Sequence, residues 1–247
     1  IRASKMEEEK VVVTLHGDRV SGTYALFPMR GGRDWLIHRM DPPVDERRVA
    51  VPFGVIPMRV SAGPLPEDDG WIYEPRWHGI RATVTDDTGR VVILDGAGEN
   101  VSLKFPEIRR IARAIGHLEV ILDGVIVPID SFGAVRHDRA GLARRLRIGS
   151  DSGARNAGKT APVVFMAFDV LWVEGHSVTA QPWELRRRQL DDLRLDGPGW
   201  RTSPTMALEE TFALDTGVVA KRRDSPYRIG VEPPGPRSPD WIEVVAV

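Results

Sequence analysis

The chain has 247 residues, with 34 basic and 35 acidic side chains that give a formal net charge of −1. Its 42% hydrophobic and 28% charged residues are typical of a soluble globular protein and exclude a disordered chain. The absence of cysteine excludes disulfides, thiolate zinc sites and a cysteine nucleophile. No apolar run reaches the roughly 18 residues that span a bilayer, and no signal peptide opens the chain, so we expect a cytoplasmic protein with no membrane partner.

The first 70 residues predict a small β unit followed by an irregular stretch. Residues 1–10 are polar and charged, and we expect them to be frayed. Three short strands follow, at Val11 to Leu15, Gly22 to Phe27 and Trp35 to His38. Six prolines between residues 40 and 70 indicate a linker or an irregular lead-in. We therefore expect a β segment at 1–42, a linker at 43–56 and a larger domain at 57–247.

Strands outnumber helices in the larger domain. The predicted strands are 71–76, 80–86, 91–95, 118–129, 162–173, 217–222 and 241–246. The predicted helices are 105–115, 138–147, 182–194 and 206–213. Because the two kinds of element do not alternate regularly, we expect an α+β fold with antiparallel sheets.

One stretch matches the phosphate-loop pattern G-x-x-x-x-G-K-[ST], through Gly153, Gly158, Lys159 and Thr160. A true phosphate loop follows a strand and opens a helix, since backbone N–H groups and the helix N-terminus hold the phosphates. Here a helical stretch precedes the pattern and a β-rich run follows it. We therefore expect a surface loop that binds no nucleotide.

Five segments of the larger domain occur in an order typical of one enzyme family. They are Tyr73 to Arg81, Ile121 to Val127, Phe165 to Trp172, Gly217 to Tyr227 and Trp241 to Val245. Together they resemble the nucleotidyltransferase motifs of ATP-dependent DNA ligases, most closely those of the ligase domain of bacterial ligase D. The resemblance implies a DNA-ligase-like nucleotidyltransferase fold, with two antiparallel sheets flanked by helices, and no OB-fold domain in this chain.

A second resemblance concerns the N-terminal β segment. Leu15 to Gly22, followed by Trp35 to His38, is similar to the tail of the 3′-phosphoesterase domain that precedes the ligase domain in ligase D. The histidine-rich front half of that domain, which holds its metal ligands, is not in this chain. We therefore expect no phosphoesterase activity.

The departures from the family pattern lie at the positions that carry the chemistry. In the family, the lysine of K-x-D-G attacks the α-phosphorus of ATP. In this chain, Arg76 occupies the position of that lysine, and His78 occupies the position of the aspartate. A guanidinium does not readily supply a free lone pair, so Arg76 should not form a covalent adenylate. Val125 replaces the glutamate of D-G-E, Thr216 replaces a metal-binding glutamate, and Glu243 replaces a lysine of the last motif.

Other positions keep the family's residues. They are Glu74, Gly79, Arg81, Asp123, Gly124, Phe168, Asp169, Gly217 and Lys221. By resemblance, Phe168 stacks on adenine and Lys221 faces the phosphates. The alternatives are a core phenylalanine and a solvated lysine. Kept and changed positions together predict a vestigial nucleotide pocket without an intact catalytic residue or a metal site.

Two of the substitutions reverse the expected charge pattern and suggest an ion pair. The first and last motifs of the family approach each other around the nucleotide, and they now carry Arg76 and Glu243. We predict that the two side chains form a salt bridge that occupies part of the former ATP site. The alternative is that both are solvated.

Arginine clusters mark three predicted helices. They are Arg109, Arg110 and Arg113, then Arg144, Arg145 and Arg147, and finally Arg186, Arg187 and Arg188. We expect the first two clusters to be solvated faces, with phosphate contact as the alternative. We expect the third to pair with Asp191 and Asp192 on the helix surface.

Three functions remain open from the residues alone. The first is a catalytically degenerate ligase relative that needs no cofactor and binds DNA ends or DNA-repair proteins during DNA end repair. The second is an active ATP-dependent DNA ligase that uses ATP and Mg²⁺ at an atypical site, with Lys221 as a substitute nucleophile. The third is a structural or regulatory interaction protein without a nucleic-acid role.

Overall fold

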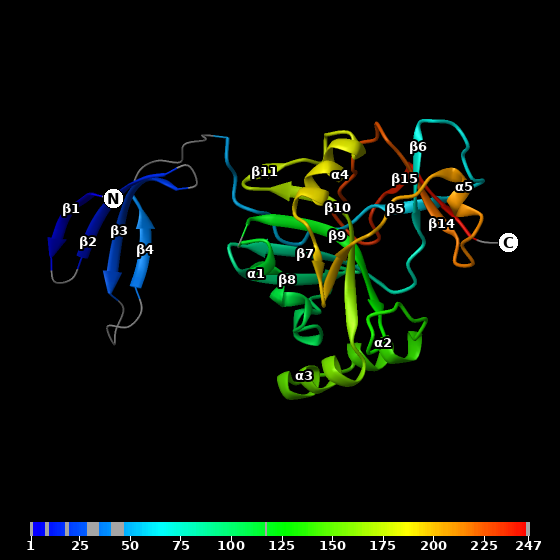
Figure 1. Cartoon of the computed structure of the whole chain (residues 1–247), viewed down its shortest axis with the longest axis horizontal. Helices are drawn as coiled ribbons and strands as arrows, with labels where there is room; N and C mark the ends of the chain where they lie inside the picture. The colour runs from blue at the N-terminus through cyan, green and yellow to red at the C-terminus, as the bar shows by residue number, and fades with distance from the viewer. Residues whose placement is uncertain are drawn as a thin grey trace. The chain divides into compact units, whose positions relative to one another are not determined.

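The computed structural model describes residues 2–7, 10–17, 20–28, 35–40, 47–116 and 118–245. The chain divides into two compact units, Ile1–Arg48 and Val49–Val247. The division falls inside the stretch predicted as a linker, of which residues 43–46 lie outside the described residues. Each unit is described by itself below (Figure 1).

The first unit is a four-stranded antiparallel sheet in the order β1-β2-β3-β4. Its strands are β1 (Arg2–Glu7), β2 (Lys10–His16), β3 (Ser21–Pro28) and β4 (Trp35–Arg39). Three of them confirm the predicted strands. The expectation of a frayed start was wrong, because the polar residues of β1 pair along β2 from Thr14 to Lys10.

The second unit contains two sheets. The larger has the order β12-β13-β10-β9-β7-β8, with β11 paired to β10, and the smaller has the order β5-β15-β14-β6. The strands of the larger sheet are β7 (Ile80–Asp87), β8 (Arg90–Asp95), β9 (Val120–Pro128), β10 (Val163–Val173), β11 (His176–Ser177), β12 (Asp196–Gly197) and β13 (Trp200–Thr202). Those of the smaller are β5 (Arg59–Ala62), β6 (Trp71–Pro75), β14 (Val218–Arg222) and β15 (Arg237–Val244).

The helices of the second unit are short. They are η1 (Ser102–Lys104), η2 (Ile108–Arg110), α1 (Ile111–Ala114), α2 (Arg139–Leu146), α3 (Asp151–Thr160), α4 (Trp183–Asp192) and α5 (Leu208–Thr211). Figure 1 shows α2 and α3 together beyond one end of the larger sheet, and α4 on the opposite side. The helix predicted at 105–115 is split into the 3-10 turn η2 and the short helix α1.

The centre of the unit lies on β9 and β10, which are mostly apolar and buried along almost their whole length, as is typical of strands covered on both faces. Leu122 and Ile126 of β9 pack in one hydrophobic cluster with η2 and α1. Ile121 and Val125 point to the opposite face and pack in a second cluster. Since side chains alternate along a strand, one strand supplies both cores. The second cluster lies between the two sheets, where the motifs meet.

The predicted α+β fold with two sheets flanked by helices is confirmed, with two local differences. β15 pairs in parallel with β5, and β10 pairs in parallel with β13, so the sheets are not purely antiparallel. Both partners are very short strands in stretches without a clear period-two pattern. The lead-in also contributes to the core, since Val51, Val55 and Met58 are buried.

The phosphate-loop pattern forms helix α3, which corrects the expected surface loop. Ser150 caps the helix by accepting a hydrogen bond from the Gly153 N–H at 3.2 Å, and Ala154 is buried beneath it. Glycine and serine lower helix propensity, so composition alone favours a loop, and capping and burial decide the outcome. The backbone N–H groups of the pattern lie within a helix rather than in a loop ahead of one.

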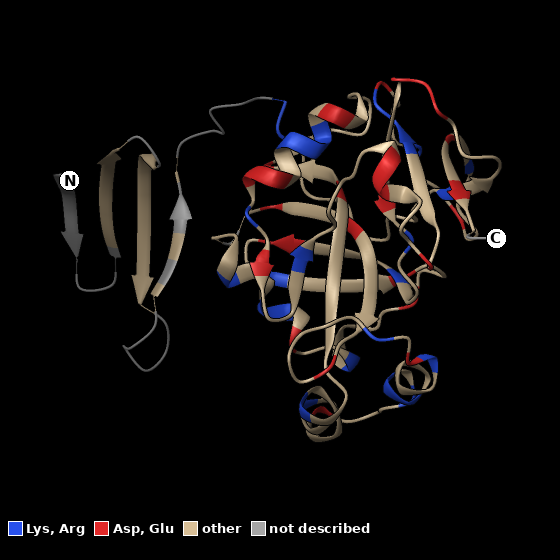
Figure 2. Ribbon diagram, turned by 45° about the vertical axis from the view of Figure 1, so that its right-hand side comes forward, with Lys and Arg blue, Asp and Glu red and all other residues tan. Residues whose placement is uncertain are grey.

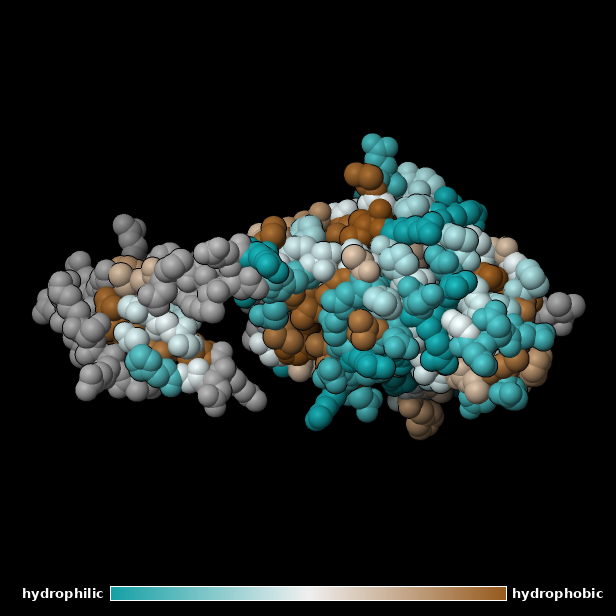
Figure 3. Space-filling view, turned by 90° about the horizontal axis from the view of Figure 1, so that it is seen from above, coloured by the Kyte–Doolittle hydropathy of each residue, from teal (hydrophilic) through white to brown (hydrophobic). Residues whose placement is uncertain are grey.

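The surface of the second unit mixes apolar and hydrophilic side chains. Phe132, Phe212 and Val231 are among the exposed apolar residues and come from separate segments. On the face drawn in Figure 3, brown and teal side chains alternate in the same way. This mixture is ordinary for a globular protein. Among the described helices, none combines the length and apolar character needed to cross a membrane.

Candidate functional site

A cavity of about 100 Å³ lies between the two sheets of the second unit. Seven of the ten predicted site residues line it, and they are Glu74, Arg76, Arg81, Val125, Phe168, Lys221 and Glu243. The other lining residues are Val60, Pro75, Trp77, Val219 and Trp241. Segments that are far apart in the sequence therefore meet at one place, as the motif order predicts.

The register of the smaller sheet explains how these side chains converge. β14 lies between β6 and β15, and Val219 is opposite both Glu74 and Glu243. Lys221 is opposite Trp241. Residues two apart on a strand point to the same face, so these five side chains all face the larger sheet.

A buried ion pair forms one side of the cavity. The Lys221 Nζ donates to Glu74 Oε1 at 2.7 Å and to the Phe168 carbonyl at 3.2 Å, and both charged side chains are 2% exposed. Arg187 of α4 adds a second cation 3.6 Å from the same Glu74 oxygen. Trp241 covers the amine, with its ring centroid 4.1 Å from the Lys221 Nζ. The amine is thus held on several sides.

Burial shifts both members of this pair towards their neutral forms. It lowers the pKa of Lys221 and raises the pKa of Glu74, because each charge loses its hydration. Their mutual attraction opposes both shifts. Removing either partner would leave the other as an uncompensated buried charge.

Arg76 lies at the opposite side of the cavity, one residue beyond β6. Its backbone N–H donates to the Gly217 carbonyl at 3.0 Å, and the φ of +81° at Gly217 is one that glycine adopts readily. The Arg76 Nε donates to the Glu243 carboxylate, and Nη1 lies 3.0 Å from the ring nitrogens of His78. The predicted Arg76–Glu243 salt bridge is confirmed.

His78 and Thr216 lie beside the cavity rather than in it. They line a neighbouring open pocket with His137, whose ring centroid is 5.1 Å from that of His78. Burial, together with the charges of Arg76, His137 and Arg139, lowers the pKa of His78. The neutral ring can accept a hydrogen bond from Arg76. Within the described part of the chain, no three acidic or histidine side chains are grouped so that they could hold a metal ion.

The wall formed by the larger sheet is held by a second ion pair. Arg81 binds Asp123 through two bonds of 2.7 Å each, and the Tyr227 hydroxyl donates to the same carboxylate at 2.5 Å. Burial and the Asp123 charge raise the pKa of Tyr227 well above its ordinary value. Phe168 lies against this pair, with the Arg81 guanidinium 4.6 Å from its ring centroid.

A bulge in β10 directs Phe168 into the cavity. The pairing of β10 with β9 shifts between Ala167 and Asp169, which leaves Phe168 between them as the extra residue. The Phe168 ring is 6% exposed and belongs to the second hydrophobic cluster, so it is a core residue. Its centroid also lies 4.1 Å from the Lys221 Nζ, so it contacts the candidate site as well. The lysine is not solvated, so that alternative is wrong.

Comparison with known proteins agrees with this arrangement. The family model described as the ATP dependent DNA ligase domain matches residues 65–244. The chain belongs to the ATP-dependent DNA ligase family. It is 30% identical over 243 residues to the multifunctional non-homologous end joining protein LigD of Mycolicibacterium smegmatis. The aligned region covers 95% of this chain and 29% of that protein.

Other relatives of this ligase-family chain point the same way. It is 31% identical to the LigD of Mycobacterium tuberculosis H37Rv over 95% of its own length and 29% of that protein. The solved ligase domain of M. tuberculosis LigD superposes with a TM-score of 0.59 at 27% identity, over 77% of this chain and 59% of the other. The chain thus spans under a third of the length of these curated relatives.

Glycines of the ligase motifs have a packing role in this chain. A Cβ on Gly79 would lie 2.1 Å from the Ile126 carbonyl oxygen, and one on Gly124 would lie 2.4 Å from the Met166 carbonyl oxygen. The strands of the larger sheet approach too closely for any larger residue. The retained glycines are therefore explained by the scaffold, whatever the site does.

Two arginines expected on the surface are buried. Arg186 is 0% exposed and binds Asp169 through two bonds of 2.8 and 2.9 Å, and Arg145 is 1% exposed and binds Glu107 at 2.7 Å. Helix spacing alone does not reveal a distant carboxylate, so the sequence predicts a solvated Arg145 and an Arg186 paired on the helix surface with Asp191 and Asp192. Arg187 likewise reaches a distant carboxylate, that of Glu74 in the cavity wall, and makes the expected pair with Asp191 at 2.9 Å as well.

Trp241 is a cavity residue that the predicted site omits. The signal was present, because Trp241 opens the final ligase motif and precedes Glu243 by two positions. Its ring is fully buried, and Phe168 and Tyr227 both pack edge-on against it at centroid distances of 5.7 Å.

Proposed function

We propose that this ligase-family domain forms no lysyl-adenylate and acts by binding DNA ends without covalent transfer, in DNA end repair. The observation that carries the proposal is Arg76, which stands at the nucleophile position and is paired with Glu243. A guanidinium keeps its proton at all working pH values, so it cannot attack the α-phosphorus. The DNA-repair setting comes from LigD, which is named for non-homologous end joining.

The residues present do not fit ATP and magnesium. Pockets for ligands of this size have volumes of roughly 300–1,000 Å³, against about 100 Å³ here. Arg76, Arg81 and Lys221 are the cations that line the cavity, and each is already paired with a carboxylate. Thr216 and Val125 supply no carboxylate for a metal. We therefore assign no catalytic step to ATP or to a metal in this domain.

An active ligase would need Lys221 as a substitute nucleophile. Its amine is near the cavity, and burial lowers its pKa, which favours the reactive neutral form. Its contacts with Glu74 and Phe168 oppose this role, because the amine would have to leave both to reach a nucleotide. The binding proposal is thus the better supported of the two.

Intact mass spectrometry separates these proposals. The purified chain, incubated with ATP and Mg²⁺, should gain no AMP adduct, and Arg76→Lys alone should gain none because the acidic positions are still missing. Lys221→Met serves as the matched variant. An AMP adduct on the wild-type chain that disappears in Lys221→Met would overturn the proposal in favour of the active ligase.

Fluorescence polarisation tests the binding half of the proposal. Labelled nicked and blunt duplexes should bind with an affinity that falls as salt rises, because phosphate contacts release counterions. Absence of salt-dependent binding to either duplex would contradict the proposal and favour an interaction protein without a nucleic-acid role.

A further inference from the structure

Basic charge is concentrated in one segment of the second unit. Residues 136–160, which span α2 and α3, carry seven basic and two acidic side chains, a net charge of +5. The whole chain has a net charge of −1, so the rest of it carries −6. Figure 2 shows blue segments on both helices, which lie at the end of the larger sheet. Such asymmetry indicates a surface for a polyanion.

Most of these cations are not neutralised. Arg139, Arg147, Arg155 and Lys159 are exposed, and none of them forms an ion pair with any residue that the structure describes. Arg144 has only a loose contact of 3.9 Å with Asp138. By contrast, Arg187 and Arg188 of α4 pair with acidic residues one helical turn away. The α2–α3 surface therefore keeps its positive charge available.

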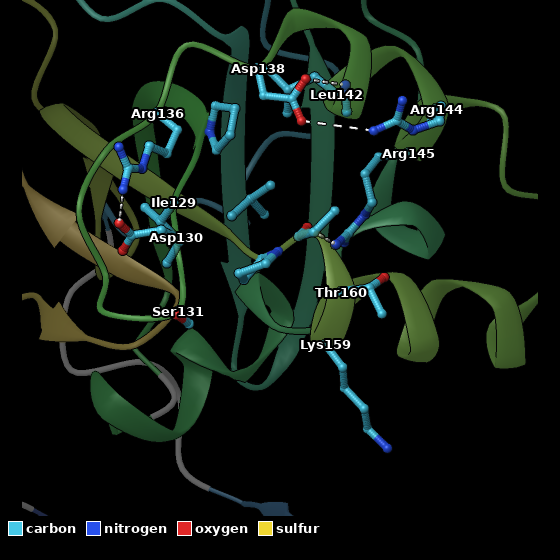
Figure 4. A pocket seen from close by; sticks show the side chains of 15 residues that line it. Ile129, Asp130, Ser131, Arg136, Asp138, Leu142, Arg144, Arg145, Lys159 and Thr160 are labelled. Atoms are coloured by element: carbon cyan, nitrogen blue, oxygen red, sulfur yellow. Dashed lines mark hydrogen bonds and ion pairs between the residues drawn. The ribbon is translucent and has the colours of Figure 1, made fainter.

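A cavity of about 260 Å³ opens beside these helices, and Figure 4 shows its lining. Two acidic residues line it, but both are engaged. Asp130 pairs with Arg136 at 2.5 Å and accepts the N–H groups of its own loop. Asp138 caps α2 through the Gly141 N–H at 2.8 Å. Both carboxylates are thus occupied by hydrogen bonds and an ion pair with neighbouring residues.

Arg145, which lines the same cavity, has a side-chain donor that is unsatisfied. Its two Nη atoms donate to Ala161, Lys104 and Glu107, yet its Nε is buried with no partner among the described residues. A buried N–H group without an acceptor is unusual in a folded protein. An oxygen of a bound anion would satisfy it.

We propose that the α2–α3 surface binds the sugar–phosphate backbone of duplex DNA, with one phosphate in the cavity beside Arg145. This inference rests on the proposed function and names the surface that performs it. Residues 136–160 contain no Phe, Tyr or Trp, whereas sites for single strands rely on aromatic stacking. Contacts to phosphates carry no base information, so binding is independent of sequence.

Charge removal on this surface is the main test. The variant Arg139→Gln/Arg147→Gln/Arg155→Gln loses three exposed cations, and the control Arg188→Gln/Arg194→Gln/Arg222→Gln loses three exposed arginines elsewhere. In polarisation titrations with a blunt duplex, the first should bind at least about tenfold more weakly. The plot of log affinity against log salt concentration should become less steep by about 2.7, which is roughly 0.9 for each of three lost phosphate contacts.

The outcomes distinguish the two proposals. If the wild-type chain binds no duplex even at low salt, the proposed function fails and the surface fails with it. If the wild-type chain binds and both triple variants lose affinity equally, only the surface assignment is wrong. Thermal melts of all three proteins establish that they are folded, and Lys159→Glu provides a single change at an exposed position should the triple variant unfold.

The phosphate beside Arg145 has its own measurement, which leaves the protein unchanged. In ¹⁵N–¹H spectra of the wild-type chain, the Arg145 Nε–H signal should move when duplex DNA is added. The Arg186 Nε–H, already bound to Asp169 at 2.8 Å, is the matched control and should stay in place. An Arg145 signal that does not move at saturating DNA would overturn the assignment of the cavity.

Discussion

The inter-sheet cavity and the α2–α3 surface use the same kinds of side chain to opposite effect. In the cavity, Arg76, Arg81 and Lys221 each contact a carboxylate. On the surface, arginines such as Arg147 and Arg155 have no acidic partner among the described residues. The difference teaches that burial decides whether a cation is paired within the protein. A charge removed from water must be paired, while a hydrated charge needs no partner and stays available to bind a ligand.

The largest expected effect is at the buried pair. Lys221→Met leaves Glu74 charged and buried with Arg187 at 3.6 Å as its remaining cation, so the free energy of unfolding should fall by about 3–5 kcal/mol. Urea denaturation measures it. The control Lys221→Met/Glu74→Gln should recover part of the loss, since it leaves no charge behind. A loss below about 1 kcal/mol would contradict the view that a buried cation must be paired.

The half-exposed pair should contribute less. The Arg76 and Glu243 side chains are 24% and 29% exposed, so a double-mutant cycle with Arg76→Ala and Glu243→Ala should give a coupling of about 1 kcal/mol or less. Raising the salt to about 1 M should reduce that coupling through screening. A coupling as large as that of the buried pair would show that the cavity is drier than these exposures indicate.

The pH dependence of stability tests whether burial and the neighbouring cations lower the pKa of His78. Its folded-state pKa is lowered by burial and by Arg76, His137 and Arg139, so the unfolded chain binds the proton more readily. Stability should therefore fall as the pH drops through the ordinary histidine value of about 6.5. Urea denaturation at pH 7.5 and 5.5 should show a smaller loss for His78→Asn than for the wild-type chain. Equal losses would contradict the assignment.

The smallest expected effect is at the α2–α3 surface. The change Arg139→Gln/Arg147→Gln/Arg155→Gln should alter the free energy of unfolding by no more than about 0.5 kcal/mol per site, because these exposed cations form no ion pair with any described residue. Calorimetry or urea denaturation gives the value. A markedly destabilised triple variant would mean that the surface serves the fold rather than a ligand.

Strands were predictable wherever both faces of a sheet are covered. β9 and β10 appear in the sequence as apolar runs interrupted only by Asp123-Gly124 and by Asp169. The five ligase motifs together predicted seven of the twelve residues that line the cavity. Helix α3 was missed because its stability comes from the Ser150 cap and the buried Ala154 rather than from propensity. The parallel partners β5 and β13 were missed because they have only four and three residues.

The sequence by itself determined the family, the order of its motifs, and the residues that occupy them, such as Arg76 and Val125, because these depend only on residue type. It also determined the charge of residues 136–160. The tertiary structure alone decided which cations are neutralised: Arg186 meets Asp169 and Arg145 meets Glu107 across long stretches of chain. Such pairings depend on distances of a few ångströms between separate elements, which no local pattern encodes.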